Sequence, residues 1–249
     1  MSVGSLGAQV RRGRIRDLVA ADGSLDLGSA ADELGVSEMT IRRDLLELER
    51  QGLVRRVRGG AVAVEPELFE RRAARHNTAK LKVAAKLRAL LPAQGVVAMD
   101  SSSTIHRFAS EIAAPDLTVL TAGIETFQAL RGRVGRALLT GGDWEDATGS
   151  FVGPLALRAV EDLHFDVTFL SSSGLDADRG AMESTLENAQ VKRALRRASA
   201  TVVLAVDASK LGQPAAALAL PLTEIDVLVT DLDPADPALD RYRDHLDLL

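Results

Sequence analysis

Short apolar runs alternate with helical patterns along most of the chain beyond residue 95. The runs have the length of buried strands and fall at 96–99, 117–120, 137–139, 167–170, 201–206 and 225–229. Helical periodicity separates many of them, at 105–112, 125–130, 155–163 and 187–198. Strands that alternate with helices form a mostly parallel sheet covered on both faces. The pattern therefore predicts an α/β domain for the larger part of the chain.

The length and composition leave room for a second, smaller domain. A chain of 249 residues suits one large domain or a small domain joined to a medium one. There are no cysteines, which excludes disulfides and thiolate metal sites. Residues 1–9 lack the pattern of a signal peptide, and no apolar run approaches the roughly 20 residues that span a bilayer. We expect a cytoplasmic protein with no membrane partner.

The N-terminal 52 residues show three helical patterns instead of strands. Apolar residues at 15, 18 and 19 form the stripe of a first helix over 11–21. Ser29 is the expected N-cap of a second helix that ends at Gly35, where glycine allows the sharp turn. A third helix runs from Glu38 to 51–52, with residues 41, 45 and 48 facing inward. Small Ala31 lets the last two helices approach, as in a helix-turn-helix.

In a helix-turn-helix, the second helix of the pair lies in the major groove and its N-terminal residues meet the base edges. Arginine there can bind guanine with two hydrogen bonds or hold a phosphate. The predicted DNA contacts on this helix are Ser37, Met39, Thr40, Arg42 and Arg43.

Residues 53–62 predict a two-stranded hairpin, or wing, that turns at Gly59-Gly60. Its predicted DNA contacts are Arg55, Arg56, Arg58 and Gly59. Residues 41–60 hold six arginines against three acids, although the whole chain has a formal net charge of −5. A local basic face on an acidic chain favours a DNA reader attached to a separate body. The alternative is a three-helix protein-interaction module with a basic surface.

These patterns divide the chain into three parts. Residues 1–64 form the expected winged helix-turn-helix, and Glu65-Pro66-Glu67 interrupts the periodicity as the expected boundary. Residues 65–77 are an arginine-rich linker, and residues 78–249 form the α/β domain, whose first helix covers 78–91.

Polar residues follow several of the predicted strands. Open α/β sheets bind ligands at the carboxyl ends of their strands, so these loops are candidate ligand contacts. They contribute Asp100, Ser102, Ser103, Thr104, Gly141, Gly142, Ser172, Asp176, Asp207 and Lys210. Hydroxyls and backbone N–H groups after a strand can cradle an anion, although single loops of this kind are usually only caps and turns. Neither a G-x-G-x-x-G nor a P-loop sequence is present, which argues against nucleotide sites.

The N-terminal part contains four telling segments: 14–30, Val36-Ser37-Glu38-Met39-Thr40-Ile41-Arg42-Arg43-Asp44-Leu45, 48–52 and Arg58-Gly59-Gly60-Ala61. Through them the chain resembles the DeoR family of bacterial repressors, which commonly has histidine at the position of Arg58, and the resemblance covers nearly the whole chain. In the larger domain it lies in 140–142, 151–156, 173–176, 191–194 and 207–210.

The resemblance implies a sensor domain similar to sugar-phosphate isomerases, with phosphorylated sugars as effectors. It implies that Asp100 and residues 102–104 contact phosphate and hydroxyls, that Asp207 and Lys210 hold the sugar, and that Lys192 supplies positive charge. The serine-rich loop 101–104 replaces a glycine common in the family, and residues 121–123 lack its Thr-Asn pair.

An isomerase-type enzyme that carries a DNA-binding domain is the alternative. Asp100, Asp176 and Asp207 with Lys210 could supply acid-base chemistry. The four histidines lack a metal-ligand spacing, so we expect neither a metal site nor another cofactor. We favour a sensor without catalytic residues, because turnover would erase the signal. We expect a homo-oligomer, a dimer or tetramer, that represses a sugar operon and is released from operator DNA by the effector.

Overall fold

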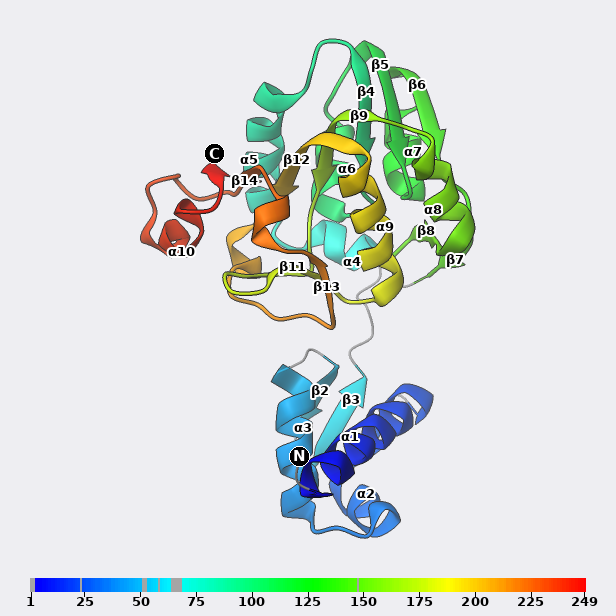
Figure 1. The fold of residues 1–249 in the computed structure, drawn as a ribbon, viewed down its shortest axis with the longest axis vertical. Helices are drawn as coiled ribbons and strands as arrows, with labels where there is room; N and C mark the ends of the chain where they lie inside the picture. The colour runs from blue at the N-terminus through cyan, green and yellow to red at the C-terminus, as the bar shows by residue number, and fades with distance from the viewer. Residues whose placement is uncertain (1–2, 23, 51–52, 58, 64–68, 147) are drawn as a thin grey trace. The chain divides into compact units, whose positions relative to one another are not determined.

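The computed structural model describes the chain except for residues 1–2, 23, 51–52, 58, 64–68 and 147. The chain has two compact units (Figure 1). One contains residues 1–65 and 214–216, and the other contains residues 66–213 and 217–249. The predicted boundary at Glu65-Pro66-Glu67 and the wing residue Arg58 lie outside the described residues.

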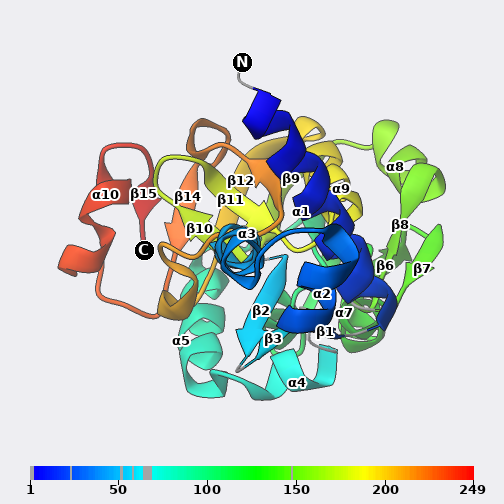
Figure 2. The same cartoon turned by 90° about the horizontal axis from the view of Figure 1, so that it is seen from below.

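The first unit is a winged helix-turn-helix, as predicted (Figure 2). Its elements are α1 (Val3–Asp22), β1 (Ser24–Asp26), α2 (Leu27–Leu34), α3 (Glu38–Arg50), β2 (Val54–Val57) and β3 (Gly60–Ala63). The strands form an antiparallel sheet in the order β1-β3-β2. The hairpin β2–β3 was predicted, whereas β1 was not, because three residues are too few to show a strand period.

The helix boundaries follow local capping. The prediction that Ser29 caps the second helix is wrong, because α2 begins three residues earlier than this cap would place it and Asp26 caps it. Asp26 has an extended backbone, and its carboxylate accepts a hydrogen bond from the Ser29 N–H at 3.0 Å. Gly35 ends α2 as predicted, with φ at +64° and its N–H directed to the carbonyls of Ala31 and Asp32. The predicted end of α3 at Gln51-Gly52 lies outside the part of the chain that the structure describes.

The first unit has its own apolar core. The stripes of α1 and α3 meet there, with Ile15 and Ile41 fully buried and Leu45 at 1% exposure. Gly60 is required where β3 crosses β1, since a Cβ atom at this position would lie 1.9 Å from the Leu25 carbonyl oxygen. The second glycine of the wing therefore allows close packing, in addition to the turn that the sequence predicts.

The second unit contains a seven-stranded parallel sheet, which confirms the predicted α/β class. The strand order is β15-β14-β12-β9-β4-β5-β6. These strands are β4 (Gly95–Met99), β5 (Ala114–Thr121), β6 (Val134–Leu139), β9 (Phe165–Leu170), β12 (Ser199–Ala205), β14 (Val227–Val229) and β15 (Asp247–Leu248). Because all paired neighbours are parallel, the loops that follow β4, β5, β6, β9 and β12 share one edge.

Helices cover both faces of this sheet (Figure 1). One apolar cluster contains side chains of α5 (Asn77–Leu87), α6 (Ser103–Ala109) and α7 (Ile124–Leu130). The other contains side chains of α8 (Gly153–Glu161) and α9 (Leu186–Arg197), with Tyr242 of α10 (Asp240–Arg243). Strand residues contribute to both clusters, which is why the strands read as continuous apolar runs.

Short elements that the sequence did not predict surround the carboxyl edge. They are the hairpin of β7 (Asp143–Glu145) and β8 (Ser150–Val152), and the antiparallel sheet of β10 (Gly174–Asp176), β11 (Gly180–Glu183) and β13 (Ala217–Leu220). A further helix, α4 (Phe69–Ala74), precedes α5. Among the helices of the described residues, none is long and apolar enough to cross a membrane.

Candidate functional site

Helix α3 presents a polar face with arginines. Met39, Arg42 and Arg43 are exposed, whereas Ile41 and Leu45 are buried against the other helices. Ser37 stabilises the start of the helix. Its hydroxyl lies 3.0 Å from the Thr40 hydroxyl and accepts a hydrogen bond from the Thr40 backbone N–H at 3.3 Å. The predicted contacts on α3 therefore lie on its outer face or at its first turn.

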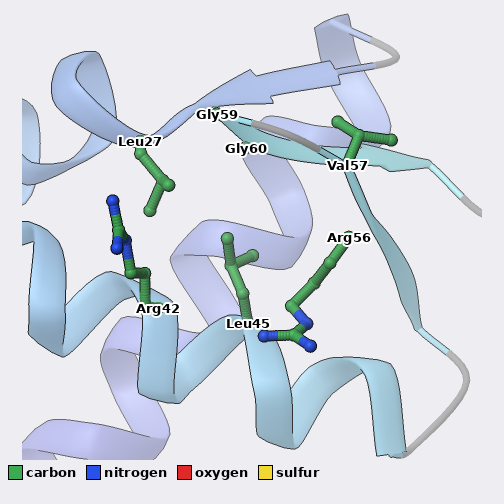
Figure 3. A pocket seen from close by; sticks show the side chains of 7 residues that line it. All are labelled: Leu27, Arg42, Leu45, Arg56, Val57, Gly59 and Gly60. Atoms are coloured by element: carbon green, nitrogen blue, oxygen red, sulfur yellow. The ribbon is translucent and has the colours of Figure 1, made fainter.

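The wing lies beside this helix, and a hollow of about 470 Å³ separates them (Figure 3). It is lined by Leu27, Arg42, Leu45, Arg56, Val57, Gly59 and Gly60. Arg42 rises from α3 toward Leu27, and Arg56 reaches from β2 toward α3. Arg42 lies 3.4 Å from the Glu38 carboxylate, a loose and exposed pair, so its guanidinium can exchange this partner for a phosphate or a base.

Two acids of α3 make contacts that the sequence analysis did not assign. Asp44 is 5% exposed, and its carboxylate lies 2.5 Å from the Arg11 guanidinium of α1. Glu49 pairs with Arg56 of the wing at 2.6 Å. Asp44 occupies a buried face next to two exposed arginines, so helical periodicity could have identified it as a structural residue.

At the carboxyl edge of the large sheet, Asp100 is the centre of a buried network. One of its carboxylate oxygens accepts from the Ser171 N–H at 2.7 Å, and the other accepts from the Ser102 N–H at 2.9 Å. The Lys192 ammonium lies 2.9 Å from Asp100 and also pairs with Glu183 of β11. These side chains join the end of β4, helix α9 and strand β11.

The three charged side chains of this triad, Asp100, Lys192 and Glu183, are each exposed by 7% or less. Burial alone would lower the pKa of the Lys192 ammonium, but the two carboxylates outweigh it and raise the pKa above its ordinary value of 10.5. The ammonium is therefore charged at neutral pH, and two acceptor groups surround it. Formal charges of −1, −1 and +1 leave one negative charge in excess.

A second polar cluster lies next to the start of α9. The Asn188 amide nitrogen donates to Thr148 at 3.0 Å and also to Glu145, and its amide oxygen accepts from Ser150 at 3.4 Å. These contacts connect the β7–β8 hairpin to the helix that carries Lys192. Sequence reasoning missed Glu145 and Glu183, which end the short strands β7 and β11, because so few residues show no local pattern. It also missed Asn188, because the helical period of α9 does not show which of its polar residues face a distant hairpin.

The predicted residues of the first loop surround Asp100. Ser102 is the N-cap of α6 and accepts from the Ile105 N–H at 3.2 Å, while Ser103 and Thr104 are buried in the first turn. The neighbouring loop approaches closely, since a Cβ atom on Gly123 would lie 2.7 Å from the Ser101 Cα. The next predicted residue, Ser172, is 6% exposed, and its hydroxyl has no hydrogen-bond partner in the described part of the chain.

Other predicted contacts have local structural partners. Asp176 accepts from the N–H groups of Asp178 and Arg179 in a turn, and Asp207 accepts from the Ser209 N–H at 3.1 Å. The half-buried Lys210 follows in the same short helical turn. Gly141 and Gly142 follow β6, and residue 142 packs against the end of the β7–β8 hairpin and the start of α8. Within the described part of the chain, none of these residues forms a hydrogen bond or an ion pair with Asp100, Lys192 or Glu183.

Helix α4 lies in the predicted linker and belongs to the second unit, where it packs on α6 and on the Asn188 cluster. The Phe69 ring is 8% exposed and meets the His106 ring of α6 edge-on at 5.2 Å. Arg72 donates to the Thr148 carbonyl at 2.8 Å, and Lys80 donates to the carbonyls of Arg72 and Arg75. Burial lowers the pKa of His106 below its ordinary value of 6.5, so the ring meets Phe69 in its neutral form at neutral pH.

An exposed recognition helix with a basic wing, joined to an α/β domain with a buried polar edge, defines a DNA-binding regulator with a sensor domain. The DeoR-like helix-turn-helix domain matches residues 11–67, and the DeoR C-terminal sensor domain matches residues 75–232. The chain belongs to the DeoR family of transcriptional regulators.

Similar proteins include the L-fucose operon activator of Haemophilus influenzae, 30% identical over 93% of this chain and 94% of the relative. The lactose phosphotransferase system repressor of Streptococcus mutans is 29% identical, over 89% and 91%. Ribose 5-phosphate isomerase A of Methanocaldococcus jannaschii has a TM-score of 0.38 at 16% identity, covering 53% of this chain and 52% of that chain.

Proposed function

We propose that this regulator represses an operon of sugar metabolism and that a phosphorylated sugar, bound at the carboxyl edge of the sheet, releases it from operator DNA. The observation that carries the proposal is the buried Asp100–Lys192–Glu183 triad beside the unpartnered hydroxyl of Ser172. A buried hydroxyl without a partner is unfavourable in the free protein and is satisfied by a polar ligand.

The charges of the triad assign parts of the ligand to parts of the site. Because two carboxylates already surround Lys192, the triad suits the hydroxyl groups of a sugar, which donate hydrogen bonds. A phosphate dianion would be repelled by the excess negative charge. We place the phosphate at the hydroxyl-rich loop 101–104, with Gly123, Gly141 and Gly142 allowing close backbone approach. Asp176, Asp207 and Lys210 remain predicted contacts of the sugar end.

Helix α4 offers a route from this site to the DNA-binding unit. Its Phe69 packs on α6, which begins at the serine loop, and its Arg72 binds the carbonyl of Thr148, a residue of the Asn188 cluster. A ligand that displaces either element changes the docking of α4. Release of DNA requires that the ligand binds the two arrangements with different affinity.

On DNA we propose a homodimer or tetramer that places two α3 helices on inverted half-sites about 34–36 Å apart. Arg42, Arg43 and Met39 would meet bases or phosphates, while Ser37 and Thr40 would orient the first turn. Arg55 and Gly59 of the wing would meet the backbone. The sensor unit would bind its ligand without converting it.

The test is a thermal-shift screen of matched pairs, each a free sugar and its phosphate ester, followed by operator binding with each hit. A ligand at 100 times its Kd stabilises by about 2.7 kcal/mol, which raises Tm by roughly 5–10 °C for a unit of this size. Shifts with free sugars alone would contradict the phosphate assignment. Steady conversion of a hit to product would favour an isomerase-type enzyme instead.

A further inference from the structure

Glu49 connects the recognition helix to the wing through two hydrogen bonds from one residue. Its carboxylate accepts from the Arg56 backbone N–H at 2.9 Å and from the Arg56 Nε at 2.6 Å. Glu49 lies in the last turn of α3, and Arg56 lies within β2. Glu49 therefore binds both the backbone and the side chain of Arg56 in the wing strand.

Strand geometry explains why Arg56, and not its neighbour, makes this contact. Successive residues of a strand point to opposite faces, so Arg55 and Arg56 cannot both face α3. Arg56 is the one that reaches toward the helix, beside Leu45 (Figure 3). Hydrogen bonds from Arg56 hold the pKa of Glu49 below its ordinary value of 4.5, so the carboxylate stays ionised at neutral pH.

We infer that Glu49 and Arg56 are a positioning pair, which fixes the wing at a set distance from the recognition helix so that both meet one DNA duplex. In this assignment Arg56 acts through the wing strand rather than by contacting a phosphate. Arg42 and Arg43 on α3 and Arg55 on β2 are then the DNA contacts. The inference rests on the DNA-binding function of the first unit.

The sign of one substitution separates this assignment from a direct phosphate contact. Glu49 is an acid next to the proposed DNA surface, so its removal reduces repulsion of the phosphates. If Arg56 contacted DNA directly, losing Glu49 would also free its guanidinium, and operator affinity would rise. If the pair positions the wing, losing Glu49 lowers the affinity despite the more favourable charge.

The experiment measures the affinity of the full chain for a duplex selected by the wild type from a random-sequence pool, using fluorescence anisotropy at several salt concentrations. We expect Glu49→Ala and Arg56→Gln each to weaken binding about three- to tenfold. The double variant should bind DNA no more weakly than the single variant with the lower affinity, because both substitutions break the same Glu49–Arg56 contact. Glu49→Gln keeps an acceptor for the Arg56 N–H and should recover part of the affinity.

Glu38→Ala is the matched control. It removes an acid from the same helix, and this acid forms only a loose, exposed pair with Arg42. It should leave affinity equal or higher. Tighter binding by Glu49→Ala, or additive losses in the double variant, would overturn the positioning role. Selection of no duplex by the wild type would instead contradict the DNA-binding function itself. Circular dichroism checks that each variant is folded. If Glu49→Ala does not fold, the affinities of Glu49→Gln and Arg56→Gln are compared instead.

Discussion

The two units of the chain place their functional residues in opposite environments. In the winged helix-turn-helix, the candidate DNA contacts that the structure describes lie between Ser37 and Gly59, and all but the half-buried Thr40 are exposed. In the sensor unit, the triad is buried, and its members lie at positions 100, 183 and 192. The comparison predicts that substitutions of the candidate contacts in the first unit should change DNA binding but not stability. Substitutions in the triad of the second unit should change both stability and ligand binding.

The largest effect is expected from Lys192→Met. Removing the ammonium leaves two buried carboxylates without their cation, which typically destabilises a protein by about 3–5 kcal/mol. Trp144 is the only tryptophan and lies in β7, so its fluorescence during urea unfolding reports the sensor unit. The exposed Lys82→Met is the control, with an expected change below about 0.5 kcal/mol. Equal unfolding midpoints for the two variants would refute a structural role of the triad.

Arg43→Ala should show the opposite behaviour. Losing a bidentate base contact weakens operator binding by roughly 1–3 kcal/mol, while the Trp144 unfolding curve should not change. Arg42→Ala is expected to act similarly. Arg158→Ala, on an exposed face of α8, serves as the control for loss of one positive charge. If both α3 variants bound the operator as tightly as the wild type, the recognition face would be assigned wrongly.

Gly60→Ala tests whether the first unit also has a position at which close packing, and not a DNA contact, determines the effect of a substitution. The added Cβ would lie within 1.9 Å of the Leu25 carbonyl oxygen, so β3 must move away from β1. We expect a loss of roughly 1–3 kcal/mol in the stability of this unit, together with weaker operator binding. Gly13→Ala in α1, where a Cβ atom meets nothing within 4 Å, is the matched control and should be neutral or stabilising. Circular dichroism melting of both variants measures the difference.

The smallest effect is expected from pH at the α4–α6 contact. The half-buried His106 has a pKa that burial lowers, so the unfolded chain binds a proton at this residue more readily than the folded chain does. Its contribution to stability is complete above pH 6.5 and is lost as the pH falls through 6.5 toward the folded pKa. His106→Gln should reduce the acid sensitivity of Trp144 unfolding between pH 7.5 and 5. An unchanged pH profile in this variant would exclude His106 as the group responsible.

The sequence predicts the elements whose periodicity is local and long enough to detect. Helix α3 follows from a period of 3.6 residues, and the wing hairpin and six of the seven strands of the large sheet follow from apolar runs and turn residues. All were predicted to within a few residues. Strands β1, β7, β10 and β15 have only two or three residues, too few to establish a period. The cap of α2 was misplaced because Asp26 and Ser29 are both good capping residues, and only backbone conformation distinguishes them.

The candidate ligand site was predictable in position but not in composition. Asp100 and Ser172 follow the neighbouring parallel strands β4 and β9, so the rule for parallel sheets correctly predicted that they lie at one edge of the sheet. Glu183 and Asn188 reach the same edge through β11 and α9, whose route depends on tertiary packing. Lys192 entered through family resemblance as a source of positive charge. The structure surrounds it with two carboxylates, and this contact between distant residues leaves no trace in local spacing.

The central claim is that a ligand at the triad controls DNA binding by the first unit. The most direct measurement is operator affinity with and without the best ligand from the screen, for the wild type and for Ser172→Ala. The Ser172 hydroxyl has no partner in the described structure, so its removal should leave ligand-free DNA affinity unchanged and should keep or slightly raise stability. We predict that the ligand weakens operator binding by the wild type and that Ser172→Ala needs at least about tenfold more ligand for the same release. An identical ligand response in both proteins would contradict the proposed site.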